Sequence, residues 1–148
     1  MKLSMMIRSI SSTLVVLLLW SVVTPSQCPG RLSYVNRNQV DPDEISLNRV
    51  VGRAVDSRGV AVPEICIGLF TNKGHRLIAQ VRANSEGRFA FKALPEGRYR
   101  LVARMPNYDY LCPVNARVRI MKARRKKQSM TLHLVPRSLD QCSWADVK

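Results

Sequence analysis

The sequence has few of the side chains from which enzymes and metal sites are built. Its 148 residues include two histidines, His75 and His133, and only 10 acidic residues. A zinc site needs three or four convergent His, Cys or carboxylate ligands, and the chain has no Cys-x-x-Cys pair. Nucleophilic catalysis needs a Ser, Cys or Thr beside an oriented base, whereas the histidines fall in an expected turn and on the solvent side of an expected strand. Glycine-rich phosphate loops are also absent. The sequence therefore predicts no catalytic activity, no metal and no other cofactor.

The acidic residues gather once, at Asp41, Asp43 and Glu44. Their hard oxygens are the ligands that calcium prefers. Pro42 interrupts the cluster, however, and no glycine allows a tight binding loop. A solvated turn is therefore favoured over a calcium site.

Long hydrophobic runs are also lacking. The longest, Leu14 to Val23, has ten residues, whereas a spanning helix needs roughly 20. Lys2 and Arg8 precede it, and Thr24-Pro25-Ser26 follows it, which is typical of a secretory signal. We expect residues 1–26 to be a signal peptide, cleaved after Ser26 or Gln27, and the protein to be secreted or located in the periplasm or cell envelope. An uncleaved signal acting as a weak anchor is the alternative.

Cys28 directly follows this signal, where the acylated cysteine of a lipoprotein could lie. The flanking residues argue against acylation, because Gln27 is not small and Pro25 replaces the usual aliphatic residue. Contact with a membrane is expected only through the signal peptide or through a lipid on Cys28.

Four cysteines remain in the mature chain: Cys28, Cys66, Cys112 and Cys142. In an oxidising compartment an even number favours two disulfides, for which three connectivities exist. Cys66 and Cys112 fall in or beside expected strands, while Cys28 and Cys142 fall in the terminal extensions. We therefore predict the pairs Cys66–Cys112 and Cys28–Cys142, with free buried thiols as the alternative.

Basic residues dominate the charge, since 24 Lys and Arg face 10 Asp and Glu, a net charge of +14. Loss of Lys2 and Arg8 with the signal leaves 22 against 10, or +12. Such a surface attracts anions whatever the fold. The net charge restricts the classes of partner but does not identify one.

The strongest basic feature is a predicted hairpin tip at residues 122–127. Its five cations are Lys122, Arg124, Arg125, Lys126 and Lys127. They could bind phosphate, sulfate or carboxylate groups on nucleic acid, on an anionic polysaccharide or on a lipid headgroup. No aromatic residues are interleaved to stack on bases, which argues against nucleic acid. The alternative is a solubilising turn that keeps edge strands from pairing with other chains.

Helical periodicity is missing throughout, whereas short apolar runs alternate with turn residues every 8 to 12 positions, as in an all-β sandwich. We expect an irregular arm at 27–48, a sandwich at 49–136 and a C-terminal tail at 137–148. Since one buried and one wet face is typical of antiparallel sheets, the prediction is a seven-stranded antiparallel sandwich of the transthyretin-like or Ig-like kind. The expected strands are residues 49–55, 65–71, 76–82, 88–93, 98–104, 114–120 and 129–135.

Two strands carry clear signals. Residues 65–70 are apolar on both sides, which predicts the most central strand. In 98–104, Tyr99 and Leu101 alternate with three arginines, so one side should face water. Phe89 and Phe91 share a side of the preceding strand, and we expect these two strands to form a hairpin with one apolar face. Gly87 and Gly97 are read as turn residues with positive φ.

Several of these segments, in this order and spacing, resemble the carboxypeptidase regulatory-like domains, whose fold is transthyretin-like or prealbumin-like. The resemblance spans roughly residues 49–136 and implies a seven-stranded sandwich used as a secreted accessory or adhesion module. Ala83-Asn84 and Asn107-Tyr108 depart from the family pattern but keep turn-compatible residues. The family's metallocarboxypeptidase activity belongs to a separate catalytic domain and does not carry over. The matching segments are residues 51–56 with Gly59 and Pro63, 86–89, 94–101 and 131–134.

Tyr108 and Tyr110 could form a sugar-stacking platform at one end of the sandwich, or a simple packed loop. Together the observations predict a secreted, non-catalytic binding or structural module whose partner is an unknown protein or an anionic or carbohydrate surface. One alternative is a polyanion- or carbohydrate-binding module that uses the basic hairpin. A weaker one is an accessory domain of a peptidase system.

Overall fold

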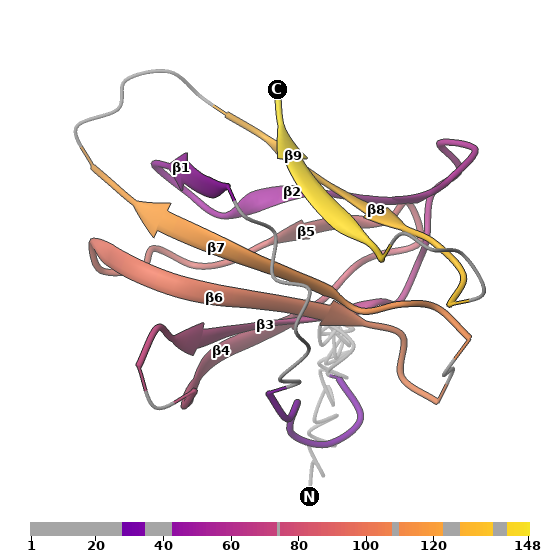
Figure 1. Cartoon of the computed structure of the whole chain (residues 1–148), viewed down its shortest axis with the longest axis horizontal. Coiled ribbons are helices and arrows are strands. Elements are labelled where there is room, and N and C mark those ends of the chain that lie inside the picture. Colours follow the sequence, from indigo (N-terminus) through magenta and orange to yellow (C-terminus); the bar gives the residue numbers. More distant parts are fainter. Residues whose placement is uncertain (1–27, 35–42, 74, 108–109, 123–127, 138–141) are drawn as a thin grey trace, which may run out of the picture.

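The computed structural model describes residues 28–34, 43–73, 75–107, 110–122, 128–137 and 142–148. Within them every regular element is a β-strand, so the chain is all-β as expected (Figure 1). The strands are β1 (Glu44–Leu47), β2 (Val51–Asp56), β3 (Cys66–Thr71), β4 (Leu77–Arg82), β5 (Arg88–Ala90), β6 (Gly97–Arg104), β7 (Val114–Ile120), β8 (Met130–Leu134) and β9 (Trp144–Val147).

The strands form two sheets that share one core. The five-stranded sheet has the order β1-β7-β6-β3-β4, and the four-stranded sheet has the order β5-β2-β8-β9. Both are mixed, because β1 pairs parallel with β7 and β2 pairs parallel with β8. The described residues thus form nine strands with two parallel pairings, where seven antiparallel strands were expected.

The two additional strands come from segments that were expected to be irregular. β1 lies in the predicted arm and β9 in the predicted tail. Each has only four residues, too few to show a period in the sequence. Both are held by pairing at a sheet edge and by burial of Leu47 and Ala145 in the core.

The core lies between the sheets and is formed by the inward side chains of alternating positions. On β6 and β7, Leu101 lies opposite Ala116 and both are fully buried. On β8, the expected alternation is confirmed, because Met130, Leu132 and Leu134 are buried while the intervening residues are half-buried.

β5 and β6 do not form the predicted hairpin, because they belong to different sheets. β5 pairs with β2, whereas β6 pairs with β3 and β7. The chain between them crosses from one sheet to the other, and the Tyr99 hydroxyl donates a hydrogen bond to the Pro95 carbonyl at 2.9 Å in this crossing. Phe89 and Phe91 are buried as expected, but they face the core from the sheet opposite Tyr99.

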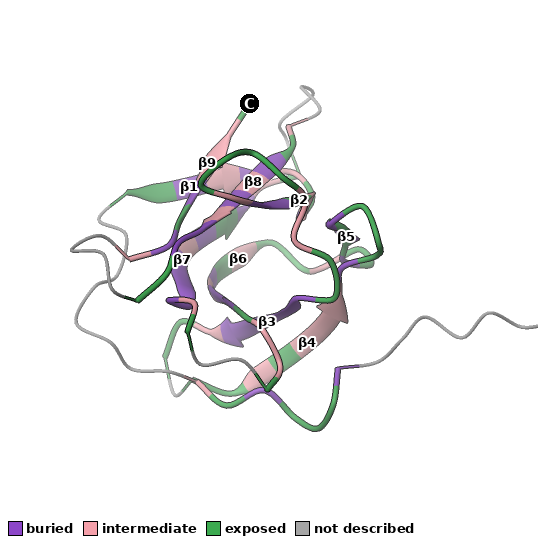
Figure 2. Cartoon of the chain, turned by 90° about the vertical axis from the view of Figure 1, so that its right-hand side faces the viewer, coloured by how far each residue is buried: buried purple, intermediate pink, exposed green. Residues whose placement is uncertain are grey.

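β3 is buried on both sides, as its sequence indicated, but it is not central: it lies between β6 and β4, and β6 is the middle strand (Figure 2). The second side of β3 is covered by residues 28–34. Leu32 packs with Phe70 and Val102 in a small apolar cluster outside the main core. Tyr34 contacts Phe70 edge to face and stacks on His75.

Candidate functional site

The outer side of the five-stranded sheet carries four arginines in two adjacent cross-strand pairs. Arg98 of β6 lies opposite Arg119 of β7, and Arg100 lies opposite Arg117. We call these four residues the arginine face. Arg98 and Arg119 are exposed, while Arg100 and Arg117 are half-buried.

The alternation of β6 and β7 places the arginines there. Successive side chains of a strand point to opposite sides of the sheet. Tyr99 and Leu101 of β6 and Val118 of β7 are buried in the core, so their neighbours in sequence must point outward. The predicted wet side of β6 is therefore confirmed at Arg98, whereas Asn115 of β7 is buried and does not belong to it.

The arginine face has little compensating charge. Glu44 of β1 forms an ion pair with Arg98, with 3.2 Å between Nε and Oε2. Within the described part of the chain, Nε and Nη1 of Arg100 and Nε of Arg117 are buried without a hydrogen-bond partner. Like charges directly opposite in a sheet oppose folding, and buried unpaired donors cost about 1–3 kcal/mol each. Among the described residues, these buried donors are therefore left without compensation.

Two open grooves of about 410 and about 490 Å³ are lined by residues of the described strands, and the second belongs to the arginine face. The groove of about 490 Å³ is lined by Arg98 and Arg119 together with Glu96, Gly97, Ile120 and Met121. Lys122 follows it, is exposed, and its backbone N–H donates to the Glu96 carboxylate. The other predicted anion-binding residues, Arg124, Arg125, Lys126 and Lys127, lie outside the described residues.

The predicted sugar platform is described only in part. Tyr108 lies outside the described residues, and Tyr110 is 58% exposed. The Tyr110 carbonyl accepts a hydrogen bond from the backbone N–H of Arg137 at 2.8 Å. This contact fixes the backbone of the loop next to the isolated bridge between Leu111 and Pro136.

The predicted disulfide connectivity is wrong. The disulfides are Cys28–Cys66 and Cys112–Cys142, with Cα–Cα distances of 5.7 and 5.4 Å. Cys28 and Cys142 do lie in terminal segments, but each segment is tied to the strand region beside it and not to the other terminus. Two intramolecular disulfides fit an oxidising, extracellular-type environment.

A second cluster was missed by the sequence analysis because two of its three residues, Trp144 and Asp146, lie in the segment predicted to be a tail. His133 of β8 and Trp144 of β9 are cross-strand neighbours. Their rings are stacked, with centroids 4.7 Å apart and planes within 10°. Asp146 contacts His133, with 2.9 Å between Oδ2 and Nε2.

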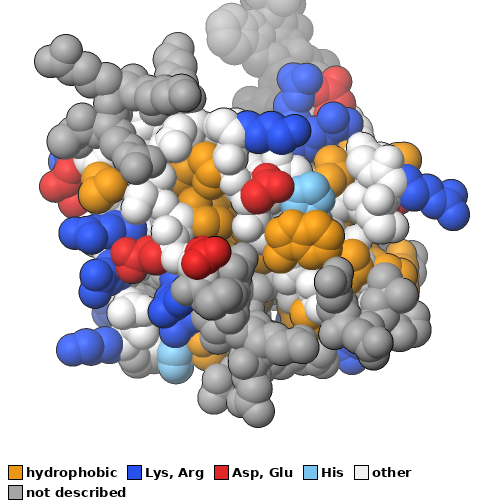
Figure 3. Space-filling view, turned by 45° about the horizontal axis from the view of Figure 1, so that its top comes forward, with side chains coloured by type: hydrophobic (Ala, Val, Ile, Leu, Met, Phe, Trp, Pro, Cys, Tyr) orange, Lys and Arg blue, Asp and Glu red, His pale blue; other side chains and the backbone are white. Residues whose placement is uncertain are grey.

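The surface near these strands is chemically mixed. On the face in Figure 3, Lys and Arg side chains lie around the left, upper and right margins, while hydrophobic side chains lie beside a histidine and carboxylates nearer the middle. Positive charge is thus not spread evenly over this basic protein.

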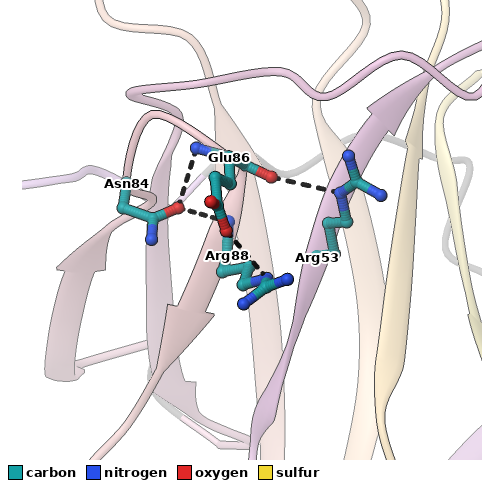
Figure 4. A network of polar contacts seen from close by, with 4 residues as sticks. All are labelled: Arg53, Asn84, Glu86 and Arg88. Atoms are coloured by element: carbon teal, nitrogen blue, oxygen red, sulfur yellow. Dashed lines mark hydrogen bonds and ion pairs between the residues drawn. The ribbon is translucent and has the colours of Figure 1, made fainter.

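The turn before β5 is held by polar contacts that are structural in character (Figure 4). Asn84 Oδ1 accepts hydrogen bonds from the backbone N–H groups of Glu86 and Arg88, at 3.0 and 2.9 Å. Arg53 donates to the Glu86 carbonyl, and the Arg88 guanidinium pairs with the Glu86 carboxylate. The side-chain amide therefore closes the turn, and the arginines bind its exposed side.

Metal binding and membrane insertion gain no support from the described ranges. No three His, Cys, Asp or Glu side chains come together there as a metal site requires, and no helix among these residues has the length and hydrophobicity of a membrane span. Asp43 is exposed and Glu44 pairs with Arg98, while Asp41 lies outside the description. Comparison with protein-family models and with curated proteins finds no match to the chain.

Proposed function

We propose that this chain is a secreted, non-catalytic binding module that holds an anionic polysaccharide on its arginine face. The observation that carries the proposal is the direct opposition of Arg98 with Arg119 and of Arg100 with Arg117. Pairs of like charges that destabilise the fold are retained when they are needed to bind a ligand. A bound anion would remove the repulsion between the guanidinium groups.

The spacing suits a repeating polyanion. Paired strands lie about 4.8 Å apart, and same-side residues along a strand are about 6.7 Å apart. The arginine face therefore presents a small rectangular array of positive charge, in which the exposed Arg98 and Arg119 can each bind a sulfate or carboxylate through two parallel hydrogen bonds and the half-buried Arg100 and Arg117 add charge beside them. A single small anion would fill only part of the array. Sulfated or carboxylated polysaccharides present such groups repeatedly along one chain.

The proposal also rests on three predictions from the sequence: the signal peptide, the family resemblance and the basic segment at residues 122–127. The signal peptide at residues 1–26 would export the chain, and the two disulfides are compatible with that route. The resemblance to carboxypeptidase regulatory-like domains, with their transthyretin-like seven-stranded sandwich, supports an accessory role without catalysis. Lys122, two residues after the end of β7, is exposed, and the four cations predicted to bind anions follow it in the sequence.

The test compares two variants that lose the same charge. In one, the four residues of the arginine face are changed to Gln; in the other, the exposed Arg58, Lys73, Arg76 and Lys92 are changed to Gln. Both variants and the wild type are eluted from immobilised heparin with a salt gradient. Removing arginines that contact sulfate groups lowers the affinity for heparin and also makes that affinity less dependent on the salt concentration. We expect the arginine-face variant to elute at clearly lower salt than the matched control.

Equal loss of retention in both variants would show that only net charge matters and would end the proposal. A third variant, with Arg124, Arg125, Lys126 and Lys127 changed to Ser, measures the share of the loop. Retention that depends on the loop alone would also count against the arginine face.

A further inference from the structure

The Trp144–His133 pair forms a flat aromatic surface at the open edge of the four-stranded sheet. β9 is the last strand in that sheet, so Trp144 has a strand neighbour on one side only. That neighbour is His133, whose ring covers one side of the indole at 4.7 Å. Trp144 nevertheless remains 38% exposed, among the largest exposed apolar side chains of the described residues.

The surface is held in place before any ligand arrives. His133 is fixed from one side by the Asp146 carboxylate and lies opposite Val55 of β2, which is buried. Val55, His133 and Trp144 thus form a row across three strands, with exposure rising toward the edge. A ring held in one orientation loses little conformational entropy on binding, which is the property that a stacking platform needs.

The chemistry around the platform favours a neutral ligand rich in hydroxyl groups. Asp146 lies on the same strand, two residues from Trp144, and opposite Thr131. It also lines an open groove of about 410 Å³ between β9 and β1, with Asp43, Glu44, Ser46 and Gln128. Three carboxylates at this groove repel phosphate and sulfate groups, whereas carboxylate and hydroxyl oxygens accept hydrogen bonds from sugar hydroxyls.

We propose that the Trp144 indole, backed by His133, is the stacking platform of a binding site for neutral oligosaccharides, and that the groove beside Asp146 takes the next sugar unit. The ring C–H groups of a pyranose form an apolar surface that can lie on the indole, while its hydroxyls reach the polar groups. The indole also carries an N–H donor at its rim. The platform itself lies in the four-stranded sheet and is tested through Trp144, whereas the groove reaches β1, whose Glu44 pairs with Arg98 of the arginine face.

The chain allows a direct optical test, because Trp20 and Trp144 are its only tryptophans. Trp20 lies in the expected signal peptide, so all tryptophan emission of the secreted protein comes from Trp144; Trp20→Phe gives the same condition in a chain that keeps its signal. The probes are tetrasaccharides of β-1,4-glucose, β-1,4-N-acetylglucosamine, β-1,4-mannose and β-1,4-xylose, each titrated to 10 mM. We expect a saturable emission change with at least one probe, because a stacked sugar displaces water from the indole. A flat response to all four would overturn the proposal.

Calorimetry with the responding sugar then locates the site. We expect Trp144→Ala to weaken binding at least tenfold and Trp144→Phe to weaken it less, since the smaller ring still stacks. His133→Ala should weaken binding several-fold through loss of the support. Ile78→Ala, at an apolar residue of similar exposure, 39% against 38%, is the matched control and should bind like the wild type, while Tyr110→Ala tests the rival platform. Unchanged affinity in both Trp144 variants, or loss of affinity in Tyr110→Ala alone, would refute the assignment.

Because β9 is short, each variant is first checked for a wild-type urea unfolding transition and for both disulfides. A Trp144→Ala variant that keeps these properties and loses only sugar binding supports the platform. If Trp144→Ala does not fold, the comparison of Trp144→Phe with the wild type decides, and equal affinities would count against the proposal.

Discussion

The backbone N–H of Ala54 donates a hydrogen bond to the carbonyl oxygen of Gly87 at 2.8 Å. This bond joins the middle of β2 to the turn that precedes β5. Gly87 has φ of +72°, and a Cβ atom built there would lie 2.5 Å from the Ala54 carbonyl oxygen. The turn therefore requires glycine for two reasons, its backbone conformation and its close approach to β2.

Gly87→Ala and Gly59→Ala separate these two reasons. Gly59 has φ of +80°, but a Cβ atom there would have no neighbour within 4 Å. Gly59→Ala should therefore cost only the left-handed conformation, about 1 kcal/mol of unfolding free energy, while Gly87→Ala should cost about 3 kcal/mol or more because the backbone must also move. Urea denaturation of both variants measures the difference. Equal costs would show that the approach to Ala54 imposes no constraint.

The disulfide connectivity can be read from peptides. Digestion of the unreduced protein followed by mass spectrometry should give cross-linked peptides for Cys28–Cys66 and for Cys112–Cys142. Recovery of a Cys66–Cys112 peptide would contradict the structure. The loops closed span 38 and 30 residues. On the chain-entropy model, replacing either pair by Ala should lower the free energy of unfolding by about 4 kcal/mol.

Ser143 should matter for the attachment of β9. Its buried Oγ donates to the Cys112 carbonyl and accepts the backbone N–H of Val135 at 3.0 Å. Ser143→Ala leaves both backbone groups unpaired in a dry site, so we expect a loss of about 1–3 kcal/mol in the free energy of unfolding. Ser57→Ala, at an exposed turn position, is the control and should change stability by less than about 0.5 kcal/mol. Similar stability of the two variants would rule out this role.

Leu32 should anchor the arm on the outer side of β3. It is 7% exposed, and its Cδ1 lies 3.0 Å from the position that a Cβ of Gly68 would occupy. We expect Leu32→Ala to destabilise the protein by about 2 kcal/mol or more, as for a buried leucine in a core. Ile78→Ala, at a residue 39% exposed, provides the comparison and should cost less. If the Leu32 variant melts like the wild type, the arm does not contribute to the fold.

The two candidate sites show which structural features can be predicted from the local order of residues and which depend on strand pairing. The arginines of β6 alternate with Tyr99 and Leu101, so a wet, basic side was predictable from local order alone. Their opposition to Arg117 and Arg119 depends on which strands pair and in what register. The platform of Trp144 and His133 was missed for the same reason, since eleven residues of sequence separate two rings that the sheet places in contact.

The sequence by itself determined the all-β class, the approximate positions of seven strands, and the burial of Phe89, Phe91 and Tyr99. These follow from short-range alternation and turn residues, which act within a few positions. The tertiary structure alone decided which sheet each strand joins, that Cys28 pairs with Cys66, and that the terminal segments supply β1 and β9. Those outcomes depend on contacts between distant residues, where the burial of a shared face selects among partners whose local patterns are equivalent.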